Sequence, residues 1–333
     1  MKYFVALALL SLNLHAKQLS VMQYNAENFF DTIHDEGKQD WTYLPLHVKN
    51  ALPEHSKNCK ELSTDFYVRE CLNLDWNEAR FSKKLQNVAK VIKSFDATNK
   101  GPDIVVLQEI ENANVINKIV TKGLDKLGYR ATALIEGDDE RGIDVGVISK
   151  YPIAKALRHP LIMNGKKINT RGILEVHIDV NGKDVVVFAN HWPSQSNPTQ
   201  ERIASAQILA ARAKAANADL VIALGDFNTL STERPSPFDS LKDFIDADPE
   251  ARRYLPNLNP GTHFYKGEWS SLDHIFILKS SSIKADFKTF QIMNRPFMLK
   301  RDQRSGQMIP NRFNFETAEG FSDHLPLSIN FNI

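Results

Sequence analysis

A carboxylate and an amide, Asp226 and Asn228, stand two positions apart directly after an apolar run. The run, residues 220–224, is unbroken and ends at a turn signal, which is typical of a strand buried on both faces. Gly225 allows a backbone shape that other residues resist, so the chain can leave the strand there. The same residues also suit an ordinary turn, because Asp and Asn bond their own backbone. We take the pair as the centre of a candidate active site.

Five other predicted strands carry polar side chains at one end. Two of these side chains have a structural alternative: Glu109 could cap the helix that follows it, and His191 could be a hydrogen-bonded structural histidine. Strand alternation points His274 away from Asp273, which favours a structural role for His274. In some of these strands the polar residues come at the end, and in the others they come at the start. If the two kinds of strand run in opposite directions, all these polar groups lie at one edge of the sheet. The groups are Asn25 after 19–24, Gln108 and Glu109 after 103–107, Asn190 and His191 after 185–189, Asp273 and His274 before 275–278, and Asp323 and His324 before 325–331.

Helices and a hairpin are predicted between these strands. Apolar residues at steps of four and three form one stripe on a helix from about 78 to 95. A second apolar face spans 115–124, and an alanine-rich helix spans 200–216. Asn181 and Gly182 separate strands 173–180 and 185–189, a strong hairpin signal. The stripe residues are Phe81, Leu85, Val88, Ile92 and Phe95.

Residues 34–77 form a polar insertion that interrupts this pattern, and regular structure is expected to resume at Asn77 or Glu78. The insertion holds the chain's only two cysteines, Cys59 and Cys71. In an exported protein, two cysteines so close in sequence favour a disulfide. A metal site is the weaker alternative, because two cysteines alone do not complete a tetrahedral shell.

The N-terminus predicts export. Lys2, an apolar core at 4–12 and the small residue Ala16 fit a secretory signal peptide over residues 1–16, leaving a mature soluble chain of 17–333 that is periplasmic or secreted. No later run approaches the roughly 20 apolar residues that a membrane helix needs, so no stable membrane insertion is expected. The net charge of +1 argues against tight binding over many phosphates, although a nuclease gripping few phosphates remains compatible. The sequence leaves the oligomeric state open.

The ordered set of motifs resembles the endonuclease/exonuclease/phosphatase superfamily, which includes secreted deoxyribonucleases, sphingomyelinases and inositol polyphosphate phosphatases. The resemblance covers nearly the whole mature chain and implies an α/β fold, a four-layer sandwich of two packed mixed β-sheets flanked by helices. Each motif is weak or moderate alone, but six in the correct order are a strong signal. The motifs are Asn25, Gln108-Glu109, Asn190-His191, Gly225-Asp226-Phe227-Asn228, Leu272-Asp273-His274 and Ser322-Asp323-His324.

The resemblance also implies site roles. It places Glu109 on a metal, with Asn25 and Asp323 close to it; Mg²⁺ suits such oxygen ligands, with Mn²⁺ or Ca²⁺ as alternatives. Asp226 and Asn228 would prepare the attacking water and hold the phosphate.

The two histidines would transfer protons and bind phosphate, because histidine changes charge near neutral pH. The family's final histidine has an acidic partner, so Asp273 is expected to orient His324 and raise its proton affinity. Which of His191 and His324 is acid and which is base stays open from the sequence.

A nuclease acting on DNA is the favoured function. The Asn190-His191-Trp192-Pro193-Ser194 run and the Asn25-x-x-Asn28-Phe29 opening resemble secreted nucleases more than lipid-directed members. The alternatives are a phospholipid or inositol-phosphate hydrolase of the same fold, and a non-catalytic binding or toxin-accessory protein.

Three more features have two interpretations each. Arg141 and Arg171 suit phosphate contacts or, slightly better, solvated turns. The basic and aromatic segment 284–319 suits nucleic-acid stacking or, more commonly, a solvated loop pinned by aromatics.

Overall fold

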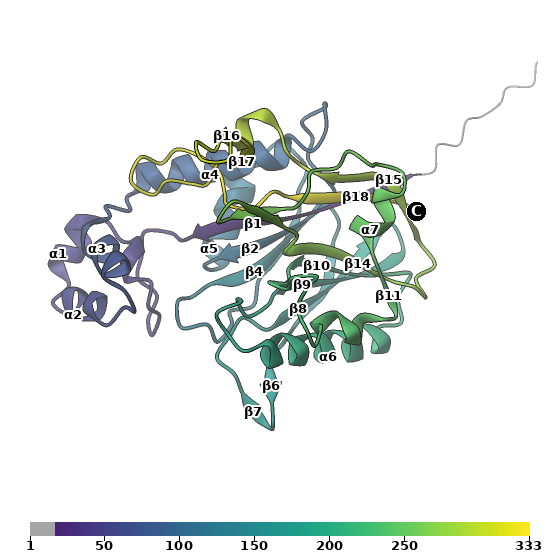
Figure 1. Ribbon diagram of the computed structural model, residues 1–333, viewed down its shortest axis with the longest axis horizontal. Helices are drawn as coiled ribbons and strands as arrows, with labels where there is room; N and C mark the ends of the chain where they lie inside the picture. The colour runs from purple at the N-terminus through teal and green to yellow at the C-terminus, as the bar shows by residue number, and fades with distance from the viewer. Residues whose placement is uncertain (1–16) are drawn as a thin grey trace, which may run out of the picture.

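The computed structural model describes residues 17–333, so the predicted signal peptide at 1–16 lies outside the described residues. Two six-stranded sheets pack face to face, and helices cover their outer faces (Figure 1). The predicted four-layer α/β sandwich is therefore confirmed.

The first sheet contains the N-terminal and C-terminal strands side by side. β1 pairs in parallel with β2 and antiparallel with β18, and β2 pairs antiparallel with β4. Its order is β15 (Lys284–Ile292), β18 (Leu327–Asn332), β1 (Gln18–Phe29), β2 (Ile104–Ile110), β4 (Asp144–Ser149) and β3 (Ala131–Ala133).

The second sheet is built around β10, which is parallel to β9 and antiparallel to β14. β8 and β9 pair antiparallel across Asn181 and Gly182, which confirms the predicted hairpin. The order is β11 (Phe244–Asp246), β14 (Asp273–Leu278), β10 (Leu220–Asp226), β9 (Lys183–His191), β8 (Ile173–Val180) and β5 (Ile153–His159).

Side-chain alternation along β9 and β10 fills two cores. Val187 and Ile222 belong to the large core between the sheets, whereas Phe188 and Val221 join the smaller core beneath α6 (Thr199–Ala215). Because successive side chains point to opposite faces, a strand buried on both sides is apolar throughout. This explains the unbroken apolar run before Asp226.

The predicted helices are present. α4 (Glu78–Lys93) buries the expected stripe, and its first turn is capped by the Asn77 side chain, which accepts from the amides of Ala79 and Arg80. α5 (Ala113–Lys118) continues into the π-helical turn η2 (Ile119–Gly123). The short helix α7 (Ala247–Arg252) follows β11 directly.

The insertion 34–77 is helical, so the expectation that it lacks regular structure is wrong. It contains η1 (Trp41–Tyr43), α1 (Leu46–Ala51), α2 (His55–Lys60) and α3 (Asp65–Asn73), which lie together at one end of the molecule (Figure 1). These helices are too short to show a clear apolar period. The buried Lys49 ammonium joins them by donating to the carbonyls of Thr42, Cys71 and Leu74.

The Cys59–Cys71 disulfide is present and ties α2 to α3, as the sequence predicts. Replacing both cysteines by serine is expected to lower the free energy of unfolding by on the order of 3 kcal/mol, because the closed loop no longer restricts the unfolded chain. Urea unfolding of the oxidised protein and of the double-serine variant measures this difference. Equal midpoints for the variant and the oxidised protein would contradict the prediction.

The aromatic side chains of segment 284–319 are mostly structural, which favours the interpretation of a loop pinned by aromatics over that of nucleic-acid stacking. Phe290, Phe313 and Phe315 are buried, and β15 forms the sheet edge. The Arg295 side chain donates to the carbonyls of Ser94 and Phe95. The rest of the segment includes η4 (Pro296–Met298) and the hairpin β16 (Leu299–Arg301) to β17 (Met308–Pro310).

Two further hairpins extend from the sandwich, and η3 (Pro237–Leu241) packs near α6. The hairpin β6 (Ile162–Met163) to β7 (Lys166–Lys167) projects away from the second sheet (Figure 1). The hairpin β12 (His263–Tyr265) to β13 (Glu268–Ser270) lies near β17. Among the helices of residues 17–333, none is long and apolar enough to cross a membrane.

Candidate active site

Strand register aligns three candidate residues across the second sheet. Asp226 on β10 pairs with His191 on the parallel strand β9 and with Asp273 on the antiparallel strand β14. The polar residues of β14 precede the strand while those of β9 and β10 end it, and the opposite direction of β14 brings all three to one edge. The sequence-based expectation of a shared edge is therefore confirmed for this sheet.

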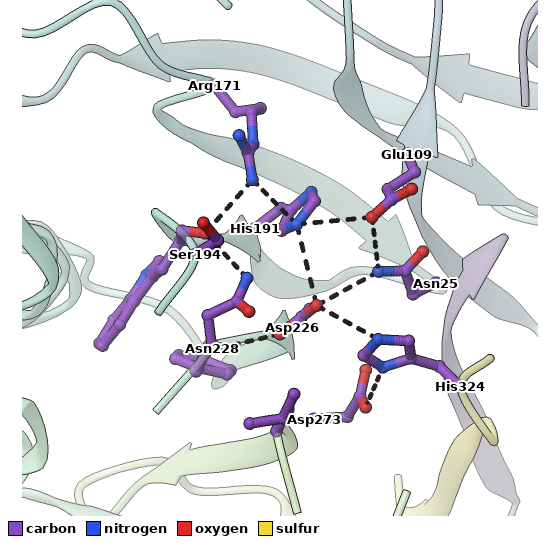
Figure 2. A network of polar contacts seen from close by, with 12 residues as sticks. Asn25, Glu109, Arg171, His191, Ser194, Asp226, Asn228, Asp273 and His324 are labelled. Carbon is purple, nitrogen blue, oxygen red and sulfur yellow. Dashed lines mark hydrogen bonds and ion pairs between the residues drawn. The ribbon is translucent and has the colours of Figure 1, made fainter. Parts of the chain in front are cut away.

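The first sheet brings Asn25 and Glu109 to the same place. Asn25 pairs with Gln108 across β1 and β2, and its side-chain nitrogen lies 3.2 Å from both Glu109 Oε1 and Asp226 Oδ2. Figure 2 shows Asn25 between these two carboxylates. A single amide therefore joins the polar groups of the two sheets. Glu109 does not cap the next helix, because the Asn112 side chain accepts from Val115 and fills that place.

The backbone at these strand ends is unusual. A side chain at Gly225, whose φ is +139°, would put its Cβ 2.0 Å from the Asn190 carbonyl oxygen. Glu109 and Asn228 have φ of 59° and 48°, in the left-handed region that favours glycine. Strained backbone of this kind persists only where the surrounding structure enforces it, and it is found most often at functional sites.

β1 does not end at Asn25, as the sequence suggested, but continues to Phe29. Its pairing with β2 is irregular between Asn25 and Phe29, where Glu27 and Asn28 have φ of 55° and 49°. A bulge of this kind turns side chains toward new directions. Here the Asn28 amide donates to Glu109 Oε2 over 2.7 Å, so the irregular segment fixes the Glu109 carboxylate.

The turn after β10 serves both interpretations given for it. The Asn228 amide donates to Asp226 Oδ1 over 2.8 Å, which is the local turn bond of an aspartate. The Asn228 side-chain nitrogen donates to the Trp192 carbonyl over 3.0 Å. Asp226 and Asn228 also line the largest polar cavity described below, which we call the main cavity. The turn therefore holds Asp226 at the cavity wall, and a turn role does not exclude a chemical one.

His324 and Asp273 form a buried charged pair. His324 Nδ1 donates to Asp273 Oδ2 over 2.7 Å, and His324 Nε2 lies 3.8 Å from Asp226 Oδ2. Burial alone would lower the pKa of His324, but the charge and hydrogen bond of Asp273 raise this pKa well above its ordinary value. The imidazole of His324 is therefore held in place by Asp273 and keeps its proton to a higher pH than a free histidine does.

Burial also raises the pKa of Asp226, against the opposing charge of His324. The nearby charges of Asp273 and Glu109 act in the same direction as burial. Asp226 is thus a carboxylate with unusually high proton affinity, a property expected of a group that accepts a proton.

His191 differs from His324 in charge. Burial and then the charges of Arg171, Arg141 and His324 hold the pKa of His191 well below its ordinary value. Arg171, itself buried, donates from Nη2 to His191 Nε2 over 2.9 Å and from Nη1 to Asp139 Oδ2 over 2.8 Å. An arginine can only donate, so His191 Nε2 accepts and its ring is neutral.

Arg171 is therefore not a solvated turn residue, and that interpretation of its motif is wrong. Arg141 is half-exposed and contacts Asp139 through Nε at 3.4 Å. Both arginines line the main cavity. His274, in contrast, turns away as the strand alternation predicts, and its Nδ1 lies 2.9 Å from Asp246 Oδ2.

Glu27 is a site residue that the sequence analysis missed. Its buried carboxylate accepts from Arg312 and from the amides of Phe313 and Asp323. Burial and the charge of Asp323 raise the pKa of Glu27 to about 7. Its position two residues after Asn25, at the same strand end, was the available signal.

An open cavity of about 860 Å³ lies over these residues. Glu109, Asp226, Asp323 and His324 line it, together with polar residues from the loop after β9 and from the β12–β13 hairpin. The cavity walls thus combine acids, arginines and a protonated histidine, which suits an anionic substrate held beside a cation.

The fold and the site together define an α/β-sandwich hydrolase. The chain belongs to the endonuclease/exonuclease/phosphatase family, whose model matches residues 62–332. Members of this family hydrolyse phosphodiesters or phosphate esters and generally depend on divalent metal ions. None of the curated proteins compared with the chain matches it.

Solved structures share the fold at low sequence identity. A family protein from Bacteroides thetaiotaomicron has a TM-score of 0.57 at 15% identity, covering 95% of this chain and 97% of that chain. A mannosyl-6-phosphatase from the same organism has a TM-score of 0.56 at 15% identity, covering 95% and 100%. D. rerio TDP2, solved with a single-strand DNA product, has a TM-score of 0.53 at 14% identity, covering 95% and 99%. At these identities the likeness establishes the fold.

Proposed function

We propose that the chain is an exported, divalent-metal-dependent phosphodiesterase that acts on DNA, with one catalytic domain over residues 17–333. The observation that carries this is the meeting of Glu109, Asp226 and the His324–Asp273 pair at one cavity, with Asn25 bonded to the first two. Such an arrangement supplies a cation site, a proton acceptor and a proton donor around one phosphate.

The oxygen-rich acids fit a divalent cation. Glu27, Asp323 and Glu109 contribute carboxylates whose charges all act on Arg312. Burial and then the charge of Asp323 raise the pKa of Glu27 to about 7. Carboxylate oxygens suit Mg²⁺, with Mn²⁺ and Ca²⁺ as alternatives. Glu109 and Asp323 would hold the ion, with Asn25 fixing Glu109. A bound ion would neutralise phosphate charge and support the leaving oxygen.

Asp226 is assigned to the attacking water. Asp226 lines the cavity, and its raised proton affinity suits orienting or deprotonating that water. Asn228 lies beside it and would hold a phosphate oxygen. Glu109 and Asp226 thus have separate roles, the first toward the ion and the second toward the water.

The two histidines divide their roles by charge. Protonated His324 would bind a phosphate oxygen and donate a proton, with Asp273 keeping it charged. Neutral His191, which Arg171 holds in place, would bind the phosphate without adding a positive charge of its own. We therefore assign His324 as the acid, a choice that the sequence alone leaves open.

DNA is preferred over phospholipid or inositol phosphate for two reasons. Apart from Phe66 and Tyr67 on α3, the large exposed apolar side chains are distributed over different elements, such as Ile162 on β6 and Tyr254 after α7, which offers little for a lipid surface. TDP2, which shares the fold, was solved with a single-strand DNA product. A non-catalytic binding role is disfavoured because it does not need the strained backbone and charged pair at the site.

Export is supported by the Cys59–Cys71 disulfide, because disulfides persist mainly in oxidising compartments. It also agrees with the predicted signal peptide, which would direct the chain to the periplasm or the medium.

A parallel substrate screen tests the proposal. With Mg²⁺ present, the purified chain 17–333 is incubated with duplex and single-stranded DNA, RNA, sphingomyelin and inositol phosphates. DNA is expected to be cleaved fastest. Faster hydrolysis of a lipid or an inositol phosphate would show that DNA is not the preferred substrate. If no substrate is hydrolysed, the assignment as an enzyme is overturned.

Replacing Asp273 by asparagine is expected to shift the pH dependence of cleavage. The Asp273 charge raises the pKa of His324, so its removal lets His324 lose its proton at lower pH. The alkaline fall of kcat/KM should therefore move toward acid by roughly 1–3 pH units, the effect of one close opposite charge. A full pH profile measures it, and an unmoved alkaline limb would contradict the assignment of His324 as the acid.

A further inference from the structure

Two exposed aromatic side chains stand on the disulfide-braced insertion. Phe66 and Tyr67 on α3 are 60% and 50% exposed, although large aromatic side chains are usually buried. Their ring centres are 5.5 Å apart in an edge-to-face arrangement. The pair therefore presents aromatic surface to the outside rather than completing a core.

The pair lines a second cavity of about 690 Å³ between the insertion and the sandwich. Its interior includes Phe30 and Tyr43, whose rings stack with centres 4.1 Å apart. Asn28 and Asn314 add amide groups to the wall. The second cavity thus offers flat apolar surface together with hydrogen-bonding groups.

The second cavity adjoins the catalytic cavity. Tyr67, Arg141 and Arg312 line both. Arg141 and Arg312 use Nε in their contacts with Asp139 and Glu27, and their terminal nitrogens have no hydrogen-bond partner within residues 17–333. Two guanidinium groups with free donors therefore stand between the aromatic surface and the catalytic acids, where a phosphodiester backbone would pass.

The aromatic pair is held in place by its own segment. The Thr64 side chain caps α3 by accepting from the Tyr67 amide, and the disulfide joins α3 to α2. Lys49 binds the carbonyl of Cys71 in the same helix. A surface fixed in this way loses little conformational freedom when a ligand stacks on it.

We propose that Phe66 and Tyr67 stack a nucleobase of the substrate strand next to the phosphate that is cleaved. This inference rests on the proposed nuclease activity. Arg141 and Arg312 contact the connecting backbone, while the amides of the second cavity face the base edge. Bases that are already unstacked enter such a site at least cost, so the enzyme prefers single-stranded nucleic acid or frayed ends over intact duplex.

The composition of the second cavity favours a base over other occupants. An acyl chain would leave Arg141, Arg312 and the carboxylates of Glu70 and Glu316 facing hydrocarbon, which is unfavourable for charged groups. A base presents both a flat face for the aromatics and polar edges for the amides.

The test compares the unaltered protein with a Phe66→Ala/Tyr67→Ala variant on three substrates. These are a single-stranded DNA oligonucleotide, an abasic strand of the same length and charge, and a small chromogenic phosphodiester. The variant is expected to lose roughly 5- to 100-fold in kcat/KM on the oligonucleotide, the range for removing base stacking. Its activity on the two base-free substrates stays unchanged.

Tyr254→Ala is the matched control, because Tyr254 is 54% exposed and lines neither cavity. It should leave all three activities unchanged. The proposal is overturned if the double variant cleaves the oligonucleotide as well as the unaltered protein, or if it loses the same factor on all three substrates.

A binding measurement separates this proposal from the nuclease assignment. An oligonucleotide carrying 2-aminopurine is added to the Asp226→Asn protein, and quenching of its fluorescence reports stacking without turnover. The same measurement is made after adding Phe66→Ala/Tyr67→Ala to the Asp226→Asn protein. Loss of the quenching supports base stacking on Phe66 and Tyr67, and quenching that persists overturns it. If the unaltered protein cleaves none of the three substrates, the nuclease assignment fails, whereas the fluorescence result still decides the subsite.

Discussion

Replacing Asp226 by asparagine is expected to lower kcat/KM for DNA by about 10³- to 10⁴-fold, toward the upper end of the range for loss of a catalytic proton acceptor. Asparagine keeps the size of the side chain but removes its charge and its ability to take a proton. Asp226 Oδ2 lies 3.2 Å from the Asn25 side-chain nitrogen and 3.8 Å from His324 Nε2, so the substitution removes a charge that lies beside both groups.

The loss should be catalytic rather than structural. Because burial raises the pKa of Asp226, a neutral amide at this position avoids the cost of a buried charge. The melting temperature is therefore expected to stay the same or rise. Steady-state kinetics with a thermal melt measures both quantities. A variant that retains more than a tenth of the activity would remove Asp226 from the catalytic role.

Replacing His324 by glutamine is expected to lower kcat/KM by about 10²- to 10⁴-fold, the range for loss of general acid catalysis. Glutamine can still donate a hydrogen bond but carries no transferable proton and no positive charge. The loss should fall mainly on kcat, because the charge matters most as negative charge grows on the phosphate. The alkaline limb that depends on His324 should also vanish from the pH profile.

The His274–Asp246 pair provides a matched control for this prediction. It is a second buried histidine bonded to an aspartate through Nδ1, at 2.9 Å, on the opposite face of β14. His274→Gln should reduce stability slightly and leave kcat within a few-fold. Equal losses for His274→Gln and His324→Gln would mean that the effect is structural.

The sandwich was predictable because its central strands can be recognised from their local sequence alone. A strand covered on both faces must be apolar throughout, so β2, β9 and β10 appear as unbroken runs. The stripe of α4 was equally clear because one face contacts the core and the other contacts water. Glu109, His191 and Asp226 could be placed because each follows such a run closely, and Asn25 and His324 because each borders a segment with a strand-like pattern.

The missed features depend on contacts between distant segments. The role of Glu27 depends on Arg312 and Asp323, far along the chain, and Arg171 gains its role by meeting His191 and Asp139 in space. The insertion was missed for another reason: its helices are too short for a period, and a buried lysine and a disulfide stabilise them. Edge strands such as β5 are only half-buried, so their apolar pattern is weak.

The most direct test of the central claim, a divalent-metal-dependent phosphodiesterase site built on Glu109 and Asp226, is cleavage of single-stranded DNA with the metal removed and returned. The protein is treated with a chelator, dialysed, and assayed before and after addition of Mg²⁺, Mn²⁺ or Ca²⁺. The account predicts cleavage that falls to background without metal and returns on adding a divalent ion. Cleavage that continues undiminished after chelation, or that no divalent ion supports, would contradict it.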